Sequence, residues 1–197
     1  MIIWTGLAIG LALLSTSSDI GRELIVNGGF EEADPTGSRP LGWSWPAENA
    51  EWISENGNRY IRLRDNASVG QAIDLKPDWW RIEVSVRVRC KGVERGEEGW
   101  YDARVAMMFA DEEGKRVGEW PPVMHWTGTF DWRLERKVFE IPEGAEKLFI
   151  SCAIYHAKGI VEYDDLSVKV VALRPKVEDG RLPEGVRIRW DLESAYR

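Results

Sequence analysis

The run from Trp100 to Ala110, WYDARVAMMFA, places an indole, a carboxylate and a guanidinium at every second position. Successive side chains of a β-strand point to opposite faces. We therefore expect Trp100, Asp102 and Arg104 to share one face, while the more apolar residues of the run occupy the other. An indole can cover the flat C–H patch of a sugar ring, and Asp and Arg can form directional hydrogen bonds with its hydroxyl groups. The pattern predicts a carbohydrate-binding face on this strand.

Four further residues are predicted to contribute to the same site. Arg87 lies on the preceding strand, on the face opposite to its valines, and His156 ends another strand. Trp120 and Trp126 belong to the loop EWPPVMHW, residues 119–126. Exposed aromatic residues indicate a binding surface when they cluster. The alternative, in which Trp120 and Trp126 only cover one end of the fold, is left open.

Short strands must position these residues, because alternating or compact apolar runs dominate the chain. No long stretch has the i, i+3, i+4, i+7 spacing of an amphipathic helix. Turn-forming pairs such as Asn56-Gly57 and Lys158-Gly159 separate the runs. The sequence therefore predicts an all-β fold, an antiparallel β-sandwich or barrel. The expected strands are 23–26, 50–53, 60–63, 69–75, 80–90, 100–110, 134–141, 148–155 and 160–173, and the long loops are 31–46 and 118–131.

Charge and hydrophobicity limit the partners. The 197 residues carry a formal net charge of -7, which opposes nucleic-acid binding because phosphates need a basic surface. Residues 1–14 are apolar and residues 15–18 are small, which is typical of an export signal over residues 1–18. The apolar run is shorter than the roughly 20 residues that span a bilayer, so no membrane anchor is expected. The protein is predicted to be secreted or periplasmic.

Two cysteines, Cys90 and Cys152, would enter an oxidising compartment after export. Both are in phase with the apolar neighbours on their strands, which fits a disulfide and a pair of buried thiols equally well. Sequence alone does not show whether their Cβ atoms approach closely enough for a bond. Both alternatives therefore stay open.

Five fragments in a fixed order resemble the extracellular jelly-roll carbohydrate-binding modules of the group around families four, nine, sixteen and twenty-two. The fragments are LIVNGGFE (24–31), GW (42–43), TGTFDW (127–132), FEIPEG (139–144) and IVEYDDLSV (160–168). The resemblance implies a jelly-roll β-sandwich that binds a polysaccharide without catalysis. A neutral plant or algal β-glycan is the expected ligand, although the arginines also admit an acidic glycan such as a uronate.

The length of the chain suits one such module, because 197 residues can bury one core. We expect residues 1–18 to be the signal peptide and residues 19–173 to form the module. Residues 174–185 are polar and contain two prolines, and a short apolar run follows. Residues 174–197 are therefore predicted to be a linker with an extra edge strand, or the opening of a catalytic domain that lies outside this chain.

The resemblance also implies a structural calcium ion that joins the first strand to the last. Glu31 matches the family's glutamate, and Asp164 matches its strand aspartate. Calcium takes about six to eight oxygen ligands from carboxylates and carbonyls. Alternation supports an inward Asp164, because Leu166 and Val168 share its face. The alternative is that both acids are solvated turn residues.

Eleven tryptophans are too many for one binding site, and some must be structural. Trp43 and Trp132 match family positions that plug the sandwich. Trp80 is in phase with Ile82 and Val84 on its strand. These three tryptophans are therefore predicted to lie in the core.

Catalysis is not expected, because the chain has only two histidines, His125 and His156. A His-rich zinc site or a Ser-His-Asp triad would need to use them, and the E-x-D-x-x-E strand signature of jelly-roll glucanases is missing. The alternatives are a polysaccharide lyase using Tyr101, Arg104 and His156, and a glycoside hydrolase with two carboxylates. A protein-binding adhesion module is a third, since Trp, Tyr and Arg are also enriched at protein interfaces.

Overall fold

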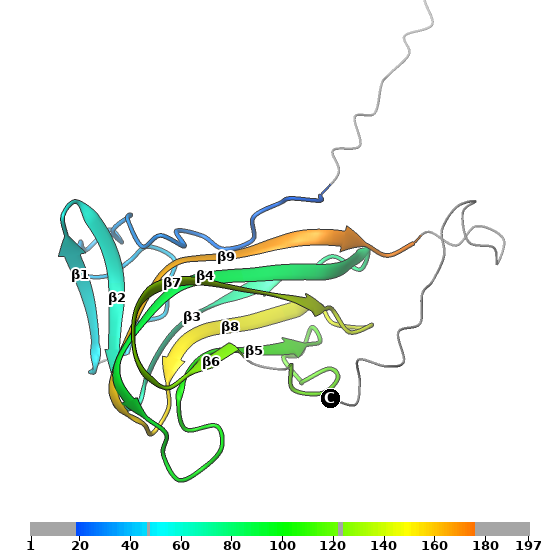
Figure 1. The fold of residues 1–197 in the computed structure, drawn as a ribbon. Helices are drawn as coiled ribbons and strands as arrows, with labels where there is room; N and C mark the ends of the chain where they lie inside the picture. Colours follow the sequence, from blue (N-terminus) through cyan, green and yellow to red (C-terminus); the bar gives the residue numbers. More distant parts are fainter. Residues whose placement is uncertain (1–18, 47, 122–123, 176–197) are drawn as a thin grey trace, which may run out of the picture.

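Two antiparallel β-sheets lie face to face in the described residues, 19–46, 48–121 and 124–175, of this computed structural model (Figure 1). The five-stranded sheet has the order β1-β2-β9-β4-β7, and the four-stranded sheet has the order β3-β8-β5-β6. The described residues contain no helix, so the predicted all-β antiparallel sandwich is confirmed. The strands are β1 (Ala50–Glu55), β2 (Asn58–Arg64), β3 (Ala67–Asp74), β4 (Trp79–Glu94), β5 (Ala103–Ala110), β6 (Met124–Trp126), β7 (Gly128–Glu140), β8 (Lys147–Ile154) and β9 (Lys158–Leu173).

Alternation along the strands fills the space between the sheets. In β4, Val84, Val86 and Val88 are fully buried, and in β5 Val105 and Phe109 face them from the other sheet. Burying an aliphatic or aromatic side chain of this size contributes roughly 1.5–3 kcal/mol. The polar residues between them are left on the two outer faces of the sandwich.

β4 and β5 follow one another in the chain but belong to different sheets. Residues 95–102 connect them, and the Gly96 N–H donates to the Tyr101 carbonyl at 2.9 Å. A Cβ on Gly96 would lie 2.4 Å from the carbonyl oxygen of His156, so only glycine fits this turn. The outward side chains of β4 and β5 therefore face opposite sides of the molecule.

The segment predicted as the first strand, 23–26, forms only one bridge, between Glu23 and Lys169 of β9. Other hydrogen bonds of this segment involve side chains. The Glu23 carboxylate accepts the N–H groups of Ile25 (3.0 Å) and Val168 (2.9 Å). Further along, the Leu166 N–H donates to the Gly28 carbonyl at 3.0 Å. The start of the module is thus tied directly to its last strand.

The tryptophan predictions are right for one residue of three. Trp43 is buried in the core with 4% exposure. Trp80 is only half-buried, because register shifts at the start of β4 turn Trp79 inward instead. Trp132 lies on the outer face of the five-stranded sheet, where its ring contacts Tyr60 edge-on at 5.4 Å. Trp132 is therefore not a core residue.

Both cysteines are buried free thiols in this structure, Cys90 on β4 and Cys152 on β8. Burial raises the pKa of the Cys90 thiol to about 12 and raises that of Cys152 as well. Both thiols therefore stay protonated and pack as small apolar groups.

The predicted signal peptide, 1–18, lies outside the described residues, and so does nearly all of the predicted linker. β9 ends at Leu173. Within the described residues, no helix has the length and hydrophobicity needed to cross a membrane.

Candidate functional site

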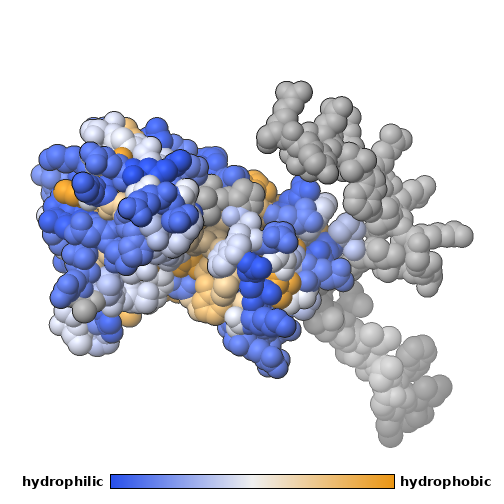
Figure 2. Space-filling model, turned by 90° about the horizontal axis from the view of Figure 1, so that it is seen from below, coloured by the Kyte–Doolittle hydropathy of each residue, from blue (hydrophilic) through white to orange (hydrophobic). Residues whose placement is uncertain are grey.

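The outer face of the four-stranded sheet contains a hollow with a volume of about 550 Å³. We call it the aromatic hollow. Figure 2 views the molecule from below Figure 1, and an apolar patch lies there between hydrophilic borders. The hollow is lined by Trp100, Arg104, Ala106, Met107, Trp120 and Tyr155.

The floor of this face comes from alternation in β5 and its neighbours. Ala106 and Met108 point outward from β5, while Val105 and Phe109 point into the core. Met108 pairs across the sheet with Phe149 of β8, whose side chain is 37% exposed. Phe149 pairs in turn with Ala72 of β3. An apolar strip therefore continues from the hollow across three strands.

An aromatic cluster fixes one wall of the hollow. Trp100 lies in the loop before β5, with 48% of its surface exposed. Its ring contacts Tyr101 edge-on at 4.3 Å and Tyr155 at 6.1 Å. His156 packs against Tyr101 at 4.7 Å. These contacts orient the indole of Trp100 while leaving it open to solvent.

Trp120 provides the other wall from the segment that follows β5. This segment is anchored where the Val117 N–H donates to the Phe109 carbonyl at 2.9 Å. The guanidinium of Arg116 lies 5.0 Å from the Trp120 ring, a cation–π contact that favours one ring orientation. Trp120 is 62% exposed, so it is the more accessible of the two indoles.

Arg104 brings hydrogen-bond donors to the floor, and Asp102 holds it there. Oδ1 of Asp102 accepts from Nε (2.7 Å) and Nη2 (2.6 Å) of Arg104. Nη1 of Arg104 has no hydrogen-bond partner among the described residues. It is not among the buried atoms without a partner, because Nε of Arg64 is the only such side-chain atom in that part of the chain. Nη1 therefore keeps contact with solvent and can donate to a ligand.

Asp102 itself is fully buried, so it positions other groups and does not touch a ligand. Its second oxygen, Oδ2, lies 3.0 Å from Nδ1 of His125 and 3.5 Å from Nη2 of Arg95. A buried carboxylate needs such partners because an unpaired buried charge is costly. The Asp102 carboxylate thus offsets the charge of Arg104, although it also lies near the guanidinium of Arg95.

The structure brings together most of the residues predicted for this site. Trp100, Arg104 and Trp120 line the aromatic hollow. Asp102 supports Arg104, and His156 supports the ring cluster that holds Trp100. The strand expected to begin at Trp100 begins at Ala103 instead, so Trp100 reaches the site from a loop.

The placement of Arg87 beside these residues is wrong. Arg87 belongs to β4, in the other sheet, where it lies near Asp164 (3.4 Å) and over the ring of Trp132 (5.3 Å). The prediction treats consecutive strands as neighbours, but the connection between β4 and β5 runs from one sheet to the other.

The placement of Trp126 on the binding surface is also wrong. The loop predicted over 118–131 contains the short strand β6, in which Met124 and Trp126 point inward and His125 points outward. Trp126 is 6% exposed and contacts Tyr163 edge-on at 6.1 Å. It is a core residue.

Sequence reasoning left Tyr155, Phe149 and Ala106 out of the site. The signal was the alternation of β8 and β5, which turns Phe149 and Ala106 away from the core. What the sequence could not supply was the pairing of β8 with β5, with Ala106 opposite Ser151.

The two predicted calcium ligands lie near the start of β2. The Glu31 carboxylate accepts the Arg59 N–H at 2.8 Å. The Asp164 side chain is 1% exposed and accepts the Asn58 amide at 3.1 Å. Burial raises the pKa of Asp164, and the Asn58 hydrogen bond opposes this rise.

Protein N–H donors thus already bond to one oxygen of Glu31 and to both oxygens of Asp164. No three His, Cys, Asp or Glu side chains among residues 19–46, 48–121 and 124–175 gather to hold a metal ion. A calcium ion bound here would need backbone carbonyls in addition to Glu31 and Asp164. The calcium site remains a prediction.

No protein-family model matches this chain, and no curated protein matches it. Solved structures do. The tandem of two family 22 carbohydrate-binding modules of Paenibacillus barcinonensis Xyn10C is similar at 13% identity and a TM-score of 0.54, over 85% of this chain and 50% of that one. The enzymatically active domain of tailspike protein 4 from bacteriophage CBA120 is similar at 12% identity and a TM-score of 0.51, over 75% of this chain and 21% of that one. A family 16 carbohydrate-binding module gives 20% identity and a TM-score of 0.49, over 74% and 98%. At these identities the likeness concerns the fold, and the predicted resemblance to jelly-roll carbohydrate-binding modules is confirmed at that level.

Proposed function

We propose that this chain is a non-catalytic module that binds a neutral polysaccharide in the aromatic hollow. The observation that carries the proposal is the pair of exposed indoles, Trp100 and Trp120, on a hollow whose floor offers the free donor of Arg104. Stacked indoles recognise the C–H faces of sugar rings, while a guanidinium donates to hydroxyl groups.

The size and charge of the hollow support a neutral sugar. Its volume of about 550 Å³ lies within the roughly 300–1,000 Å³ of small-molecule sites. Among the described residues, Arg104 is the only charged residue in the lining, and the buried Asp102 offsets its charge. An anionic group would therefore gain little Coulomb energy here.

The apolar strip beyond the hollow supports a chain rather than a single sugar. Phe149 and Met108 pair across β8 and β5 and continue the apolar surface beyond the hollow, which gives further rings a place to lie. We favour a plant or algal β-glycan as the ligand. The export signal predicted over residues 1–18 is consistent with a secreted or periplasmic module, which would act beside a catalytic domain on the same or another chain.

Affinity electrophoresis against a panel of soluble neutral glycans tests the proposal. We expect retardation on at least one glycan, and loss of that retardation in Trp120→Ala with an unchanged melting temperature. Lack of retardation on every glycan would contradict the proposal and favour a protein partner. Release of new reducing ends or unsaturated products would contradict the non-catalytic role.

A further inference from the structure

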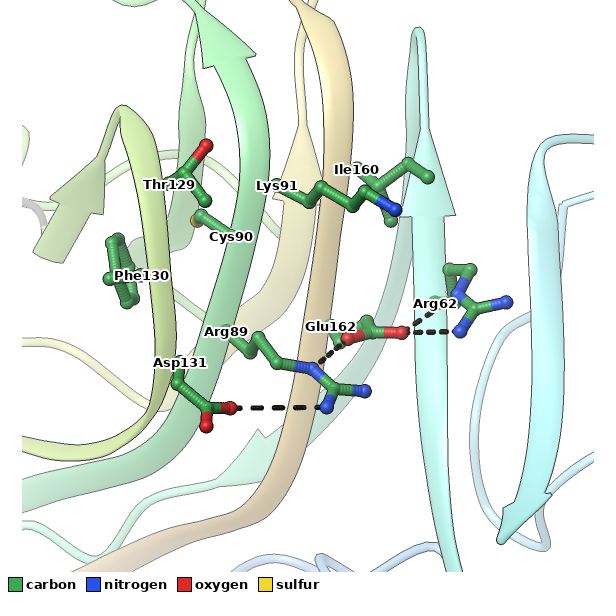
Figure 3. Close-up of a pocket in the computed structure, with 9 residues that line it drawn as sticks. All are labelled: Arg62, Arg89, Cys90, Lys91, Thr129, Phe130, Asp131, Ile160 and Glu162. Carbon is green, nitrogen blue, oxygen red and sulfur yellow. Dashed lines mark hydrogen bonds and ion pairs between the residues drawn. The ribbon is translucent and has the colours of Figure 1, made fainter.

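A second depression, with a volume of about 510 Å³, lies on the outer face of the five-stranded sheet (Figure 3). Side chains of β2, β4, β7 and β9 surround it, so it is separated from the aromatic hollow by the whole sandwich. We call it the charged depression. Its volume is also in the range of small-molecule sites.

A row of alternating charges crosses this face. Glu51 of β1, Arg62 of β2, Glu162 of β9 and Arg89 of β4 are in register on neighbouring strands. Opposite charges on directly paired residues stabilise a sheet. The row therefore runs perpendicular to the strands and joins four of them.

Glu162 is the fixed centre of the row. Its side chain is 7% exposed, and both of its oxygens are taken. Oε1 accepts from Nε (2.8 Å) and Nη2 (2.6 Å) of Arg62, while Oε2 accepts from Nε of Arg89. Glu162 therefore orients both guanidinium groups before any ligand arrives, which reduces the entropy cost of binding.

Several donors on this face remain free. Among the described residues, Nη1 of Arg89 forms one ion pair, with Asp131 at 3.9 Å, and this distance is too long for a hydrogen bond. The ammonium group of Lys91 has no hydrogen bond or ion pair with the part of the chain that the structure describes. Thr129 accepts the Gly92 N–H at 2.8 Å, so its own hydroxyl proton is available. These groups line one depression, and Figure 3 shows Lys91 extending toward Ile160 and Arg89 extending toward Glu162.

The cationic donors left open in the depression, on Arg89 and Lys91, suit a ligand with one negative charge. Three cationic residues and two acidic ones line it, and Glu51 pairs with Arg62 at 3.4 Å beside the lining. One of the acids, Asp131, is 88% exposed at the rim. Such a carboxylate accepts hydrogen bonds from hydroxyl groups but repels a second negative charge. Phe130 and Ile160 add apolar surface beside the donors.

We propose that the charged depression binds a uronate unit, a sugar ring with one carboxylate and several hydroxyl groups. The carboxylate would bind Nη1 of Arg89 and the Lys91 ammonium, and ring hydroxyls would bind Thr129 and Asp131. Trp132 lies 4.7 Å from the Arg89 guanidinium and would report the binding. This site does not depend on the proposed glycan site on the opposite face.

The test is an NMR titration of the full chain with galacturonate, followed at the Trp132 indole N–H. We expect saturable shifts with galacturonate and weaker binding with galactose or acetate, since neither offers both a carboxylate and a hydroxylated ring. Lys91→Glu should weaken galacturonate binding at least about fivefold, because it reverses one of the two charges on the carboxylate. Lys115→Glu makes the same charge change on an exposed loop and should leave the dissociation constant within about twofold.

Two results would overturn the proposal. One is binding of galactose or acetate as tight as that of galacturonate, and the other is unchanged binding in Lys91→Glu. Trp120→Ala separates the two sites. It should remove retardation on neutral glycans and leave the galacturonate dissociation constant unchanged, so failure at one face is distinguished from failure at the other.

Discussion

The two outer faces of the sandwich both combine arginine with a carboxylate, but they leave different groups free. In the aromatic hollow, Asp102 is fully buried and offsets the charge of Arg104, and the surfaces left open are two indoles. In the charged depression, Glu162 is shared by two arginines, and the groups left open include charged nitrogens of Arg89 and Lys91.

The difference shows that the kinds of residue on a face do not by themselves identify its ligand. What matters is which hydrogen-bonding groups are already satisfied within the protein. Arg104 and Arg89 each keep one free Nη1, yet the first has aromatic neighbours and the second has Lys91 and Thr129 beside it. The first environment suits a neutral sugar chain, and the second suits an anionic unit.

The largest expected effect is the loss of stability on removing Asp102, the buried carboxylate that pairs with Arg104 of the aromatic hollow. Asp102→Ala would leave the guanidinium of Arg104, which is 9% exposed, without its counterion. Breaking a buried ion pair in this way costs about 3–5 kcal/mol of unfolding free energy. Urea denaturation would measure it.

The double variant Asp102→Ala/Arg104→Met is the matched control, because it removes both charges together. It should recover a large part of the lost stability. If Asp102→Ala alone lowers the free energy of unfolding by less than about 1 kcal/mol, Asp102 does not hold Arg104 in the way that its burial indicates.

Calcium binding is the next largest expected effect. If Glu31 and Asp164 share an ion, calcium at a hundred times its dissociation constant stabilises the folded state by about 2.7 kcal/mol. EDTA should then lower the melting temperature, and Asp164→Ala should remove this sensitivity. Identical melting curves before and after chelation, in protein shown to be metal-free by elemental analysis, would leave both acids with the N–H partners described above.

Glu162 should matter less than Asp102, although it binds two arginines. The side chains of Arg62 and Arg89 are 28% and 27% exposed, so water can partly solvate them once the carboxylate is gone. Glu162→Ala should therefore cost about 2 kcal/mol. Glu135→Ala, which breaks the exposed pair with Arg133, is the control and should cost under about 1 kcal/mol. Equal losses in the two variants would argue against the fixed role of Glu162.

Much of the fold could be predicted because alternation is a local signal. The expected strands at 148–155 and 160–173 match β8 and β9 closely. The predictions failed where the alternation of a strand is interrupted and where a short strand lies inside a segment with the composition of a loop. The register shifts after Trp79 moved Trp80 out of the core, and β6 is only three residues long inside an expected loop.

The candidate site was predictable in part for the same reason. Trp100 and Arg104 were found from spacing within one segment. The separation of Arg87 from them, and the addition of Tyr155, depend on which strands pair across the molecule. Such pairings join residues far apart in sequence, and no local pattern encodes them.

The central claim is that neutral glycan binds the face of Trp120 and not the face of Trp132. Isothermal titration calorimetry with a glycan retained in electrophoresis would test it on two matched variants. Trp120→Ala should weaken binding at least about tenfold, or 1.4 kcal/mol, because it removes an exposed stacking ring. Trp132→Ala should leave the dissociation constant within about twofold, since that ring packs against Tyr60 and Arg89 on the opposite face. The reverse result, with loss in Trp132→Ala and retention in Trp120→Ala, would contradict the assignment of the two faces.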